Sequence, residues 1–151
     1  MKKFIFIMML LPVAVLAQTA FQGFGFSIQP PVLREIPDNQ AIVLFYFPAS
    51  EEFAPNVGVI RQTYPESAAK YKELTDSQLK DRNAEVIASK IAGGTYLVEY
   101  AMAVNGKKMH FYSKAVFKDG KVLLATAAAT PAQWKKLGNE MKKVVDSLSL
   151  I

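Results

Sequence analysis

The sequence contains no cysteine, one histidine and one tryptophan among its 151 residues. Without cysteine, the chain can form no disulfide-stapled scaffold and has no thiol chemistry. A single histidine also leaves too few ligands for a zinc site. Gly93-Gly94 lacks the Lys and Ser/Thr of a phosphate-binding loop, so these glycines predict a turn. We therefore expect neither a metal nor another cofactor.

Long apolar runs are also absent, because the apolar segment at residues 4–16 is shorter than the roughly 20 residues that a spanning helix needs. Lys2 and Lys3 precede this segment, and Val15-Leu16-Ala17 ends it with the small residues that a signal peptidase recognises. These features predict a signal peptide over residues 1–17 and cleavage before Gln18. We expect a soluble protein, periplasmic or secreted, with no transmembrane segment after cleavage.

Removing 17 of the 151 residues leaves 134, a common size for one domain, so we expect residues 18–151 to form a single domain. The formal charge of +5 includes Lys2 and Lys3 and falls to +3 in the mature chain. Residues 18–89 carry 6 basic and 9 acidic side chains, and residues 90–151 carry 10 and 4. In an exported protein, such a basic half favours an anionic lipid surface or an acidic protein over nucleic acid. The alternative is that these lysines only keep the surface soluble.

Local signals predict an α+β domain with a largely antiparallel sheet and helices packed on it. Asn105-Gly106 and Asp119-Gly120 are strong hairpin signals, and they predict a three-stranded meander over residues 95–130. Thr130 to Gln133 forms a capping box with Pro at the first helical position, which predicts a C-terminal helix. The other expected elements are strands at 24–28, 41–47, 56–62 and 85–92 and a surface helix from a Thr63/Glu66 capping box to about Arg82.

The strand at 41–47 has no polar alternation. Such a run of β-branched and aromatic residues is typical of a strand that is covered on both faces. We therefore expect this strand to be buried.

The two-residue turns fix the register of the meander, and with it the residues that share a face. Glu99 is expected directly opposite Tyr112, with His110 and Lys114 on its diagonals. This candidate ligand patch could exchange a proton between Glu99 and His110. The alternative is a structural cluster that satisfies a half-covered polar face. No catalytic residue is assigned, because neither a nucleophile nor an oxyanion-stabilising group accompanies the pair.

A second candidate is a basic interaction surface at the two turns of the meander. Its residues are Lys107, Lys108, Lys118 and Lys121.

Residues 45–150 resemble the PsbP-like superfamily, and within it the DcrB/LpqN-like bacterial envelope proteins. The resembling segments are 45–48, 56–60, 71–79, 94–107, 123–127 and 134–148. The resemblance implies an α/β/α sandwich of PsbP-like type, and it implies a function in interaction, with no shared catalytic residues.

Three hypotheses follow. The first is an exported, non-enzymatic binding or accessory module that acts on an envelope protein or lipid. The second is a small-molecule-binding domain or modest acid/base enzyme that uses Glu99, His110 and Tyr112. The third is a purely structural envelope component.

Overall fold

The structure, a computed structural model, describes residues 21–23, 26–28, 38–48 and 53–150. Contacts divide the chain into two compact units, residues 1–34 and 35–151. The described part of the first unit is an antiparallel pair of short strands, β1 (Phe21–Gly23) and β2 (Phe26–Ile28). The predicted signal peptide lies outside the described residues. That residues 18–151 form a single domain stays a prediction.

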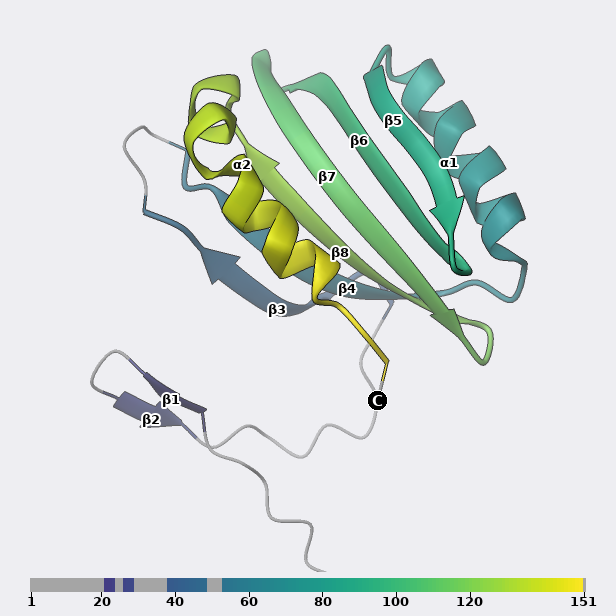
Figure 1. The fold of residues 1–151 in the computed structure, drawn as a ribbon, viewed down its shortest axis with the longest axis horizontal. Coiled ribbons are helices and arrows are strands. Elements are labelled where there is room, and N and C mark those ends of the chain that lie inside the picture. Colours follow the sequence, from purple (N-terminus) through teal and green to yellow (C-terminus); the bar gives the residue numbers. More distant parts are fainter. Residues whose placement is uncertain (1–20, 24–25, 29–37, 49–52, 151) are drawn as a thin grey trace, which may run out of the picture. The chain divides into compact units, whose positions relative to one another are not determined.

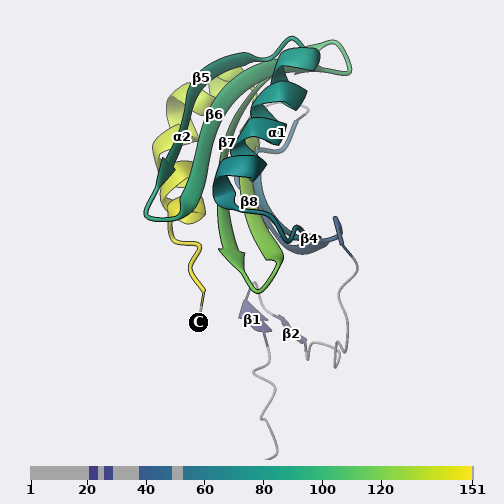
Figure 2. The ribbon, with the colours of Figure 1, turned by 90° about the vertical axis from the view of Figure 1, so that its right-hand side faces the viewer.

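The second unit contains a six-stranded antiparallel sheet in the order β3-β4-β8-β7-β6-β5 within its described residues. The two helices lie on opposite faces of the sheet, as Figures 1 and 2 show together. This arrangement confirms the expected α+β fold with an antiparallel sheet between helices. The bounds are β3 (Ala41–Tyr46), β4 (Asn56–Thr63), α1 (Ala68–Asp81), β5 (Glu85–Ala92), β6 (Thr95–Val104), β7 (Lys107–Lys118), β8 (Lys121–Ala129) and α2 (Pro131–Asp146).

The meander is confirmed residue by residue. Asn105 and Gly106 have φ of 51° and 77°, and Asp119 and Gly120 have φ of 51° and 69°. These left-handed values belong to two-residue turns whose twist matches that of the strands. The predicted register follows, with Glu99 opposite Tyr112 in the β6–β7 ladder.

The C-terminal helix is also confirmed, together with its cap. The Thr130 hydroxyl accepts a hydrogen bond from the Gln133 amide, and the Gln133 side chain accepts one from the Thr130 amide. Helix α2 packs on β8 and β7 over a floor of alanines. The fully buried residues of this layer are Val57, Ala125, Ala127, Ala129, Met141 and Val145. Small side chains on β8 thus let the helix backbone approach the sheet closely.

The other face has its own core under α1, which packs on β5 and β6. Tyr71 of α1 meets Tyr96 and Phe117 of the sheet edge to face, with ring centroids 6.0 and 5.4 Å apart. The Tyr96 hydroxyl donates a 2.9 Å hydrogen bond to Asp76. Both faces of the sheet therefore carry a packed layer.

The predicted start of the first helix was wrong. Ser67, rather than Thr63, caps α1, and its hydroxyl accepts a hydrogen bond from the Lys70 amide. Thr63 instead ends β4, where it pairs with Lys121 of β8. The intervening Pro65 disfavours helical geometry at the residue before it, which would be the first helical residue after a cap at Thr63.

The predicted burial of the strand at 41–47 was also wrong. Strand β3 is an edge of the sheet, paired with β4 on one side. Within the described residues neither helix packs on it in an extended contact. Its exposed side chains therefore include Val43, Leu44, Phe45 and Tyr46, with exposed fractions of 38%, 45%, 49% and 67%.

Candidate functional site

The predicted patch forms on the face of the sheet that α2 covers. His110 of β7 and Glu99 of β6 face the same side, and His110 Nε2 lies 2.8 Å from Glu99 Oε1. Both side chains are largely buried, with exposed fractions of 16% and 14%. The contact was predicted because the register of a two-residue hairpin places these residues on a diagonal.

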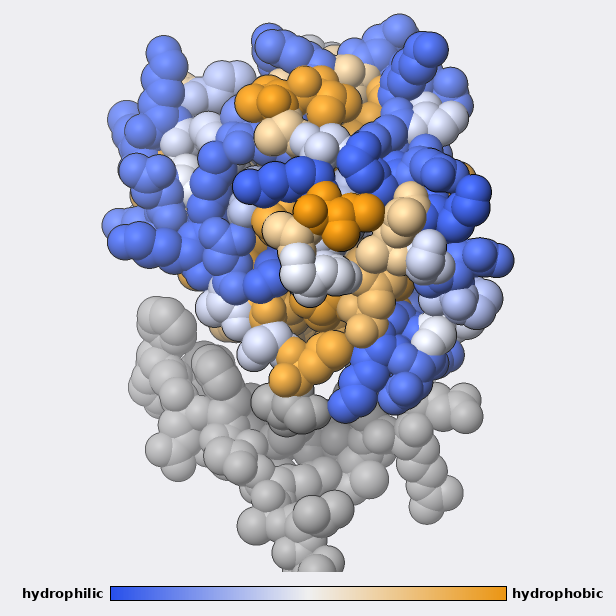
Figure 3. All heavy atoms as spheres, turned by 45° about the vertical axis from the view of Figure 1, so that its right-hand side comes forward, coloured by the Kyte–Doolittle hydropathy of each residue, from blue (hydrophilic) through white to orange (hydrophobic). Residues whose placement is uncertain are grey.

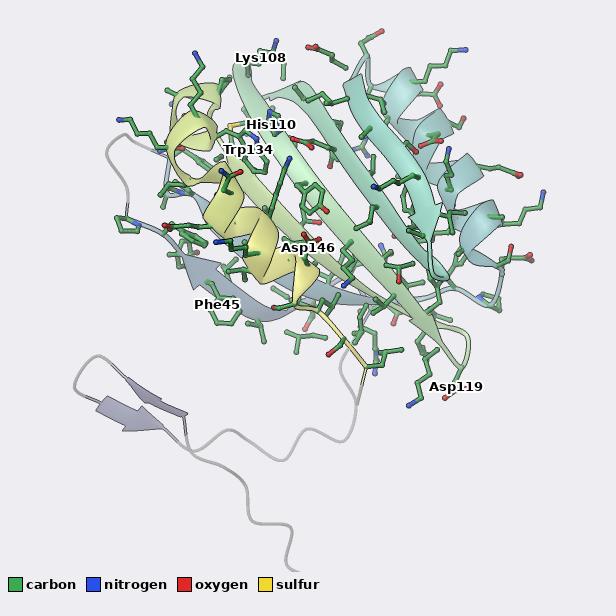
Figure 4. All side chains as sticks on the ribbon, viewed as in Figure 1. Phe45, Lys108, His110, Asp119, Trp134 and Asp146 are labelled. Atoms are coloured by element: carbon green, nitrogen blue, oxygen red, sulfur yellow. The ribbon has the colours of Figure 1, made fainter. Side chains whose placement is uncertain are left out.

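Helix α2 adds two residues that the sequence pattern did not reveal. Lys142 Nζ donates to the second oxygen of Glu99 at 2.7 Å. The Trp134 ring stacks on the His110 ring, with centroids 4.1 Å apart and planes inclined by 20°. Figure 4 shows Trp134 of α2 next to His110 of β7. Helical spacing placed Trp134 and Lys142 on the helix, but not opposite a particular strand residue.

Tyr112 and Lys114, the other two residues of the predicted patch, contact the C-terminal end of α2. The Tyr112 hydroxyl donates to the Asp146 carboxylate at 2.8 Å. Lys114 Nζ donates to the Asp146 carbonyl oxygen at 2.6 Å, where a cation also favours the negative end of the helix dipole. Tyr112 and Lys114 therefore tie the last turn of α2 to β7.

The electrostatics keep Glu99 ionised. Burial by itself raises the pKa of Glu99, but the hydrogen bonds from Lys142 and His110 outweigh burial and lower the pKa below its usual 4.5. Burial and the bond to Asp146 raise the pKa of Tyr112 to about 12. At neutral pH Glu99 is therefore an anion between His110 and Lys142, and Tyr112 keeps its proton.

The polar groups of the patch are thus paired with one another. Both Glu99 oxygens accept a hydrogen bond, and the Tyr112 hydroxyl donates a hydrogen bond to Asp146. A small pocket of about 210 Å³ adjoins them, lined by Ala88, Lys90, Leu97, Val98, Glu99, Tyr112 and Lys142. Among the described residues, no group of three or more His, Cys, Asp or Glu side chains is placed to hold a metal ion.

The four candidate lysines do not form one surface. Lys107 and Lys108 begin β7, and Lys118 ends it, next to Lys121 at the start of β8. A strand of 12 residues spans roughly 40 Å, and Figure 4 shows Lys108 and the turn residue Asp119 at opposite ends of the sheet. Lys108 lies 3.4 Å from Glu85, and Lys121 donates to the Thr63 hydroxyl at 2.9 Å. The lysines thus form two separate pairs, and their role in binding stays a prediction.

A groove of about 540 Å³ on the α1 face was not predicted. It lies near the β6–β7 turn, and none of its lining residues comes from α1. The lining residues are Phe53, Asn56, Val104, Asn105, Lys107, Met109, Phe111 and Ala128. The Phe53 carbonyl accepts a 2.7 Å hydrogen bond from the buried Gln133 side chain, which anchors this wall to α2. No local pattern could indicate the groove, because it exists only where α1 leaves the sheet uncovered.

Apolar side chains also reach the surface at the other edge of the sheet. On β5, Val86, Ile87 and Ile91 are exposed to between 41% and 50%. Figure 3, which brings this side forward, shows apolar areas between hydrophilic ones. Within the described part of the chain, no helix is long and apolar enough to cross a bilayer.

Comparison with known proteins decides the family. The PsbP family model matches residues 51–150, which is about two thirds of the chain. The chain belongs to the PsbP family. The match includes both helices and β4 to β8, and β3 precedes it. Among curated protein sequences, none matches this chain significantly.

Solved structures resemble this chain at low sequence identity. PA94 of Pseudomonas aeruginosa, a protein of unknown function, aligns with a TM-score of 0.61 and 16% identity over 88% of this chain and 96% of its own. LpqN of Mycobacterium tuberculosis, involved in cell envelope biogenesis, aligns with a TM-score of 0.51 and 20% identity over 70% and 67%. CyanoP, the PsbP protein of the cyanobacterium Synechocystis, aligns with a TM-score of 0.49 and 17% identity over 64% of this chain and 68% of its own.

Proposed function

We propose that this PsbP-family chain is an exported, non-enzymatic binding module that acts on an envelope protein or lipid. It would act in the periplasm or outside the cell after removal of residues 1–17. The observation that carries the proposal is the groove of about 540 Å³ on the α1 face. Its volume falls in the range of roughly 300–1,000 Å³ that is typical of ligand pockets.

The chemistry of the groove suits an apolar segment or acyl chain. Phe53, Met109 and Phe111 supply apolar walls, and methionine adapts its shape to irregular ligands. Asn56 and Lys107 supply polar groups, so the ligand would combine an apolar body with a polar or anionic end. The involvement of LpqN in cell envelope biogenesis gives this proposal a precedent at the level of fold.

The proposal of a non-enzymatic role is supported by the bonding of the patch. A general base must lie within hydrogen-bond reach of the substrate proton that it abstracts. In the described structure, each oxygen of Glu99 already accepts one hydrogen bond, from His110 or from Lys142, and Trp134 stacks on the His110 ring. We read this cluster as a structural support for α2.

The second candidate function is a small-molecule-binding domain or modest acid/base enzyme that uses Glu99, His110 and Tyr112. The pocket of about 210 Å³ beside Glu99 and Tyr112 favours it, because a small ligand there would reach both side chains. This ligand would share the Glu99 carboxylate with Lys142 and His110.

A binding assay separates the two sites. Titration with cis-parinaric acid, a fluorescent fatty acid, should show saturable binding to the mature wild-type protein. Ala128→Phe fills the floor of the groove and should weaken binding at least tenfold. Lys107→Glu combined with Lys108→Glu should weaken binding by a smaller factor. This factor should be larger at low salt than at high salt. The matched controls are Lys118→Glu with Lys121→Glu, about 40 Å away, and His110→Gln in the patch.

The opposite pattern would reject the proposal. If His110→Gln abolishes binding in a folded protein and Ala128→Phe has no effect, the patch is the functional site. If wild type does not bind the fatty acid, the same variants serve as baits in envelope extract. A protein retained by wild type and lost with Ala128→Phe then identifies an apolar protein segment as the ligand, and an unchanged set of retained proteins and lipids rejects the groove.

A further inference from the structure

Strand β3 presents an unusual edge. Its sequence and the two residues that follow, Ala-Ile-Val-Leu-Phe-Tyr-Phe-Pro, contain no charged side chain. Val43 to Tyr46 are all exposed, and Tyr46 is exposed to 67%. Long apolar edge strands readily pair with another chain, so proteins usually protect them with charges, bulges or a covering element.

The opposite edge of the same sheet shows such protection. Strand β5 carries Glu85 and Lys90, and a bulge between Val86 and Ala88 interrupts its ladder with β6. Helix α1 also packs on β5. In β3 the bulge lies near its start, between Ala41 and Val43, which leaves Val43 to Tyr46 in a regular ladder with β4. The two edges are therefore built differently, and β3 is the one able to accept a strand.

We propose that β3 pairs with β3 of a second copy of this chain. The two strands would run antiparallel about a two-fold axis perpendicular to the sheet and join the two sheets into one. This symmetry makes the interface isologous, with the same patch on both copies. A strand on the partner then continues the backbone hydrogen bonding that β4 begins on the other side.

The alternation of side chains in β3 fits this symmetry. Val43 and Phe45 share the face of Val57 and Val59, and Leu44 lies over Gly58 on the other face. In one such register, Leu44 lies opposite Leu44 of the partner, and the faces of the two sheets stay aligned. Val43 of each copy then lies opposite Phe45 of the other copy. Each copy would then cover apolar side chains on both faces of the other.

Charge favours a second copy as the occupant, and the available area indicates how strongly that copy would bind. The uncharged strand does not repel its own copy, whereas an anionic membrane would require cations, and residues 38–48 contain Asp38 and no Lys or Arg. Whole aromatic side chains bury about 150–250 Å², so the four exposed side chains offer roughly 300–400 Å² per copy. Stable interfaces bury about 800 Å² per partner. The dimer is therefore weak and dependent on concentration.

Sedimentation velocity of the mature chain from about 5 to 500 μM tests the proposal. Wild type should shift from monomer toward dimer. Leu44→Lys places two cations face to face at the symmetry axis and should remain monomeric over the whole range. The matched control is Ile87→Lys on β5, because Ile87 is exposed to 50% and Leu44 to 45%. This control should associate like wild type.

Two further variants keep the test decisive. If Leu44→Lys fails to fold, Leu44→Thr keeps a strand-forming residue and should weaken the dimer at least tenfold. Because the chain has no cysteine, Leu44→Cys should form an oxidised dimer, and Ile87→Cys should not. A wild type that stays monomeric throughout overturns the proposal and leaves the edge to another partner. A dimer that survives Leu44→Lys, or is lost with Ile87→Lys, overturns it as well.

Discussion

Glu99 is the residue that joins three elements, because its carboxylate accepts from His110 on β7 and from Lys142 on α2. Its two partners hold it as an anion and lower its pKa despite burial. His110 is in turn held by the stacked Trp134 ring. The prediction that Glu99 and His110 meet is confirmed, whereas the sequence did not reveal that Lys142 of α2 reaches Glu99.

Replacing Glu99 with Gln should destabilise the fold. A hydrogen bond to a charged group contributes about 1.5–3 kcal/mol, and we expect the lower end because a third of Lys142 is exposed. The pKa of Glu99 is lower in the folded state than in the unfolded state. The carboxylate therefore contributes fully to stability above the pKa of the unfolded state, and this contribution is lost as the pH falls through the pKa of the folded state.

Urea unfolding at a series of pH values measures this effect. The difference between wild type and Glu99→Gln should be full at pH 7 and shrink below about pH 4.5, the usual value for this group. Glu85→Gln, at an exposed carboxylate paired with Lys108, should change little at any pH. A difference that is constant down to pH 2 would contradict the role of the charge.

At the scale of elements, the contact between α2 and β8 depends on small residues. Ala125, Ala127 and Ala129 are buried beneath the helix, whereas Ala103 of β6, on the same face of the sheet, is exposed. A face of small side chains can either floor a groove or receive a helix. The structure places α2 on it.

Adding volume beneath α2 should therefore be costly. We expect Ala127→Leu to lower the free energy of unfolding by about 1–3 kcal/mol, because extra methylene groups force a packed layer apart. Thermal and urea unfolding would measure the loss. Ala103→Leu, the same change at an exposed position, should leave stability within about 0.5 kcal/mol. Equal losses in the two variants would show that close packing under α2 is not the cause.

At the scale of the whole molecule, the order of the strands decides which surfaces remain open. The chain passes from β4 through α1 to β5 at the far edge, and the meander then returns to place β8 beside β4. This path leaves β3 at one edge and leaves the α1 face uncovered near the β6–β7 turn. Both proposed binding surfaces are therefore consequences of topology.

Export is a property of the whole chain and stays a prediction. Intact-mass measurement of the exported protein should show the loss of residues 1–17 and a new N-terminus at Gln18. Ala17→Tyr replaces the small residue at the cleavage site and should leave the precursor uncleaved. Recovery of wild type in the membrane fraction with Lys2 still present would contradict the prediction.

The sequence by itself determined the elements whose geometry is local. Asn105-Gly106 and Asp119-Gly120 adopt the positive φ that two-residue turns need, so the register of the meander and the contact of Glu99 with His110 followed from short-range chemistry. The Thr130 cap fixed the start of α2 for the same reason. Only the tertiary structure decided that β3 lies at an edge, that Lys142 reaches Glu99 and that a groove remains beside α1. These features depend on which strands become neighbours in the folded chain. The apolar side chains of β3 indicate a surface that packs against a partner, but they do not indicate whether that partner belongs to the same chain.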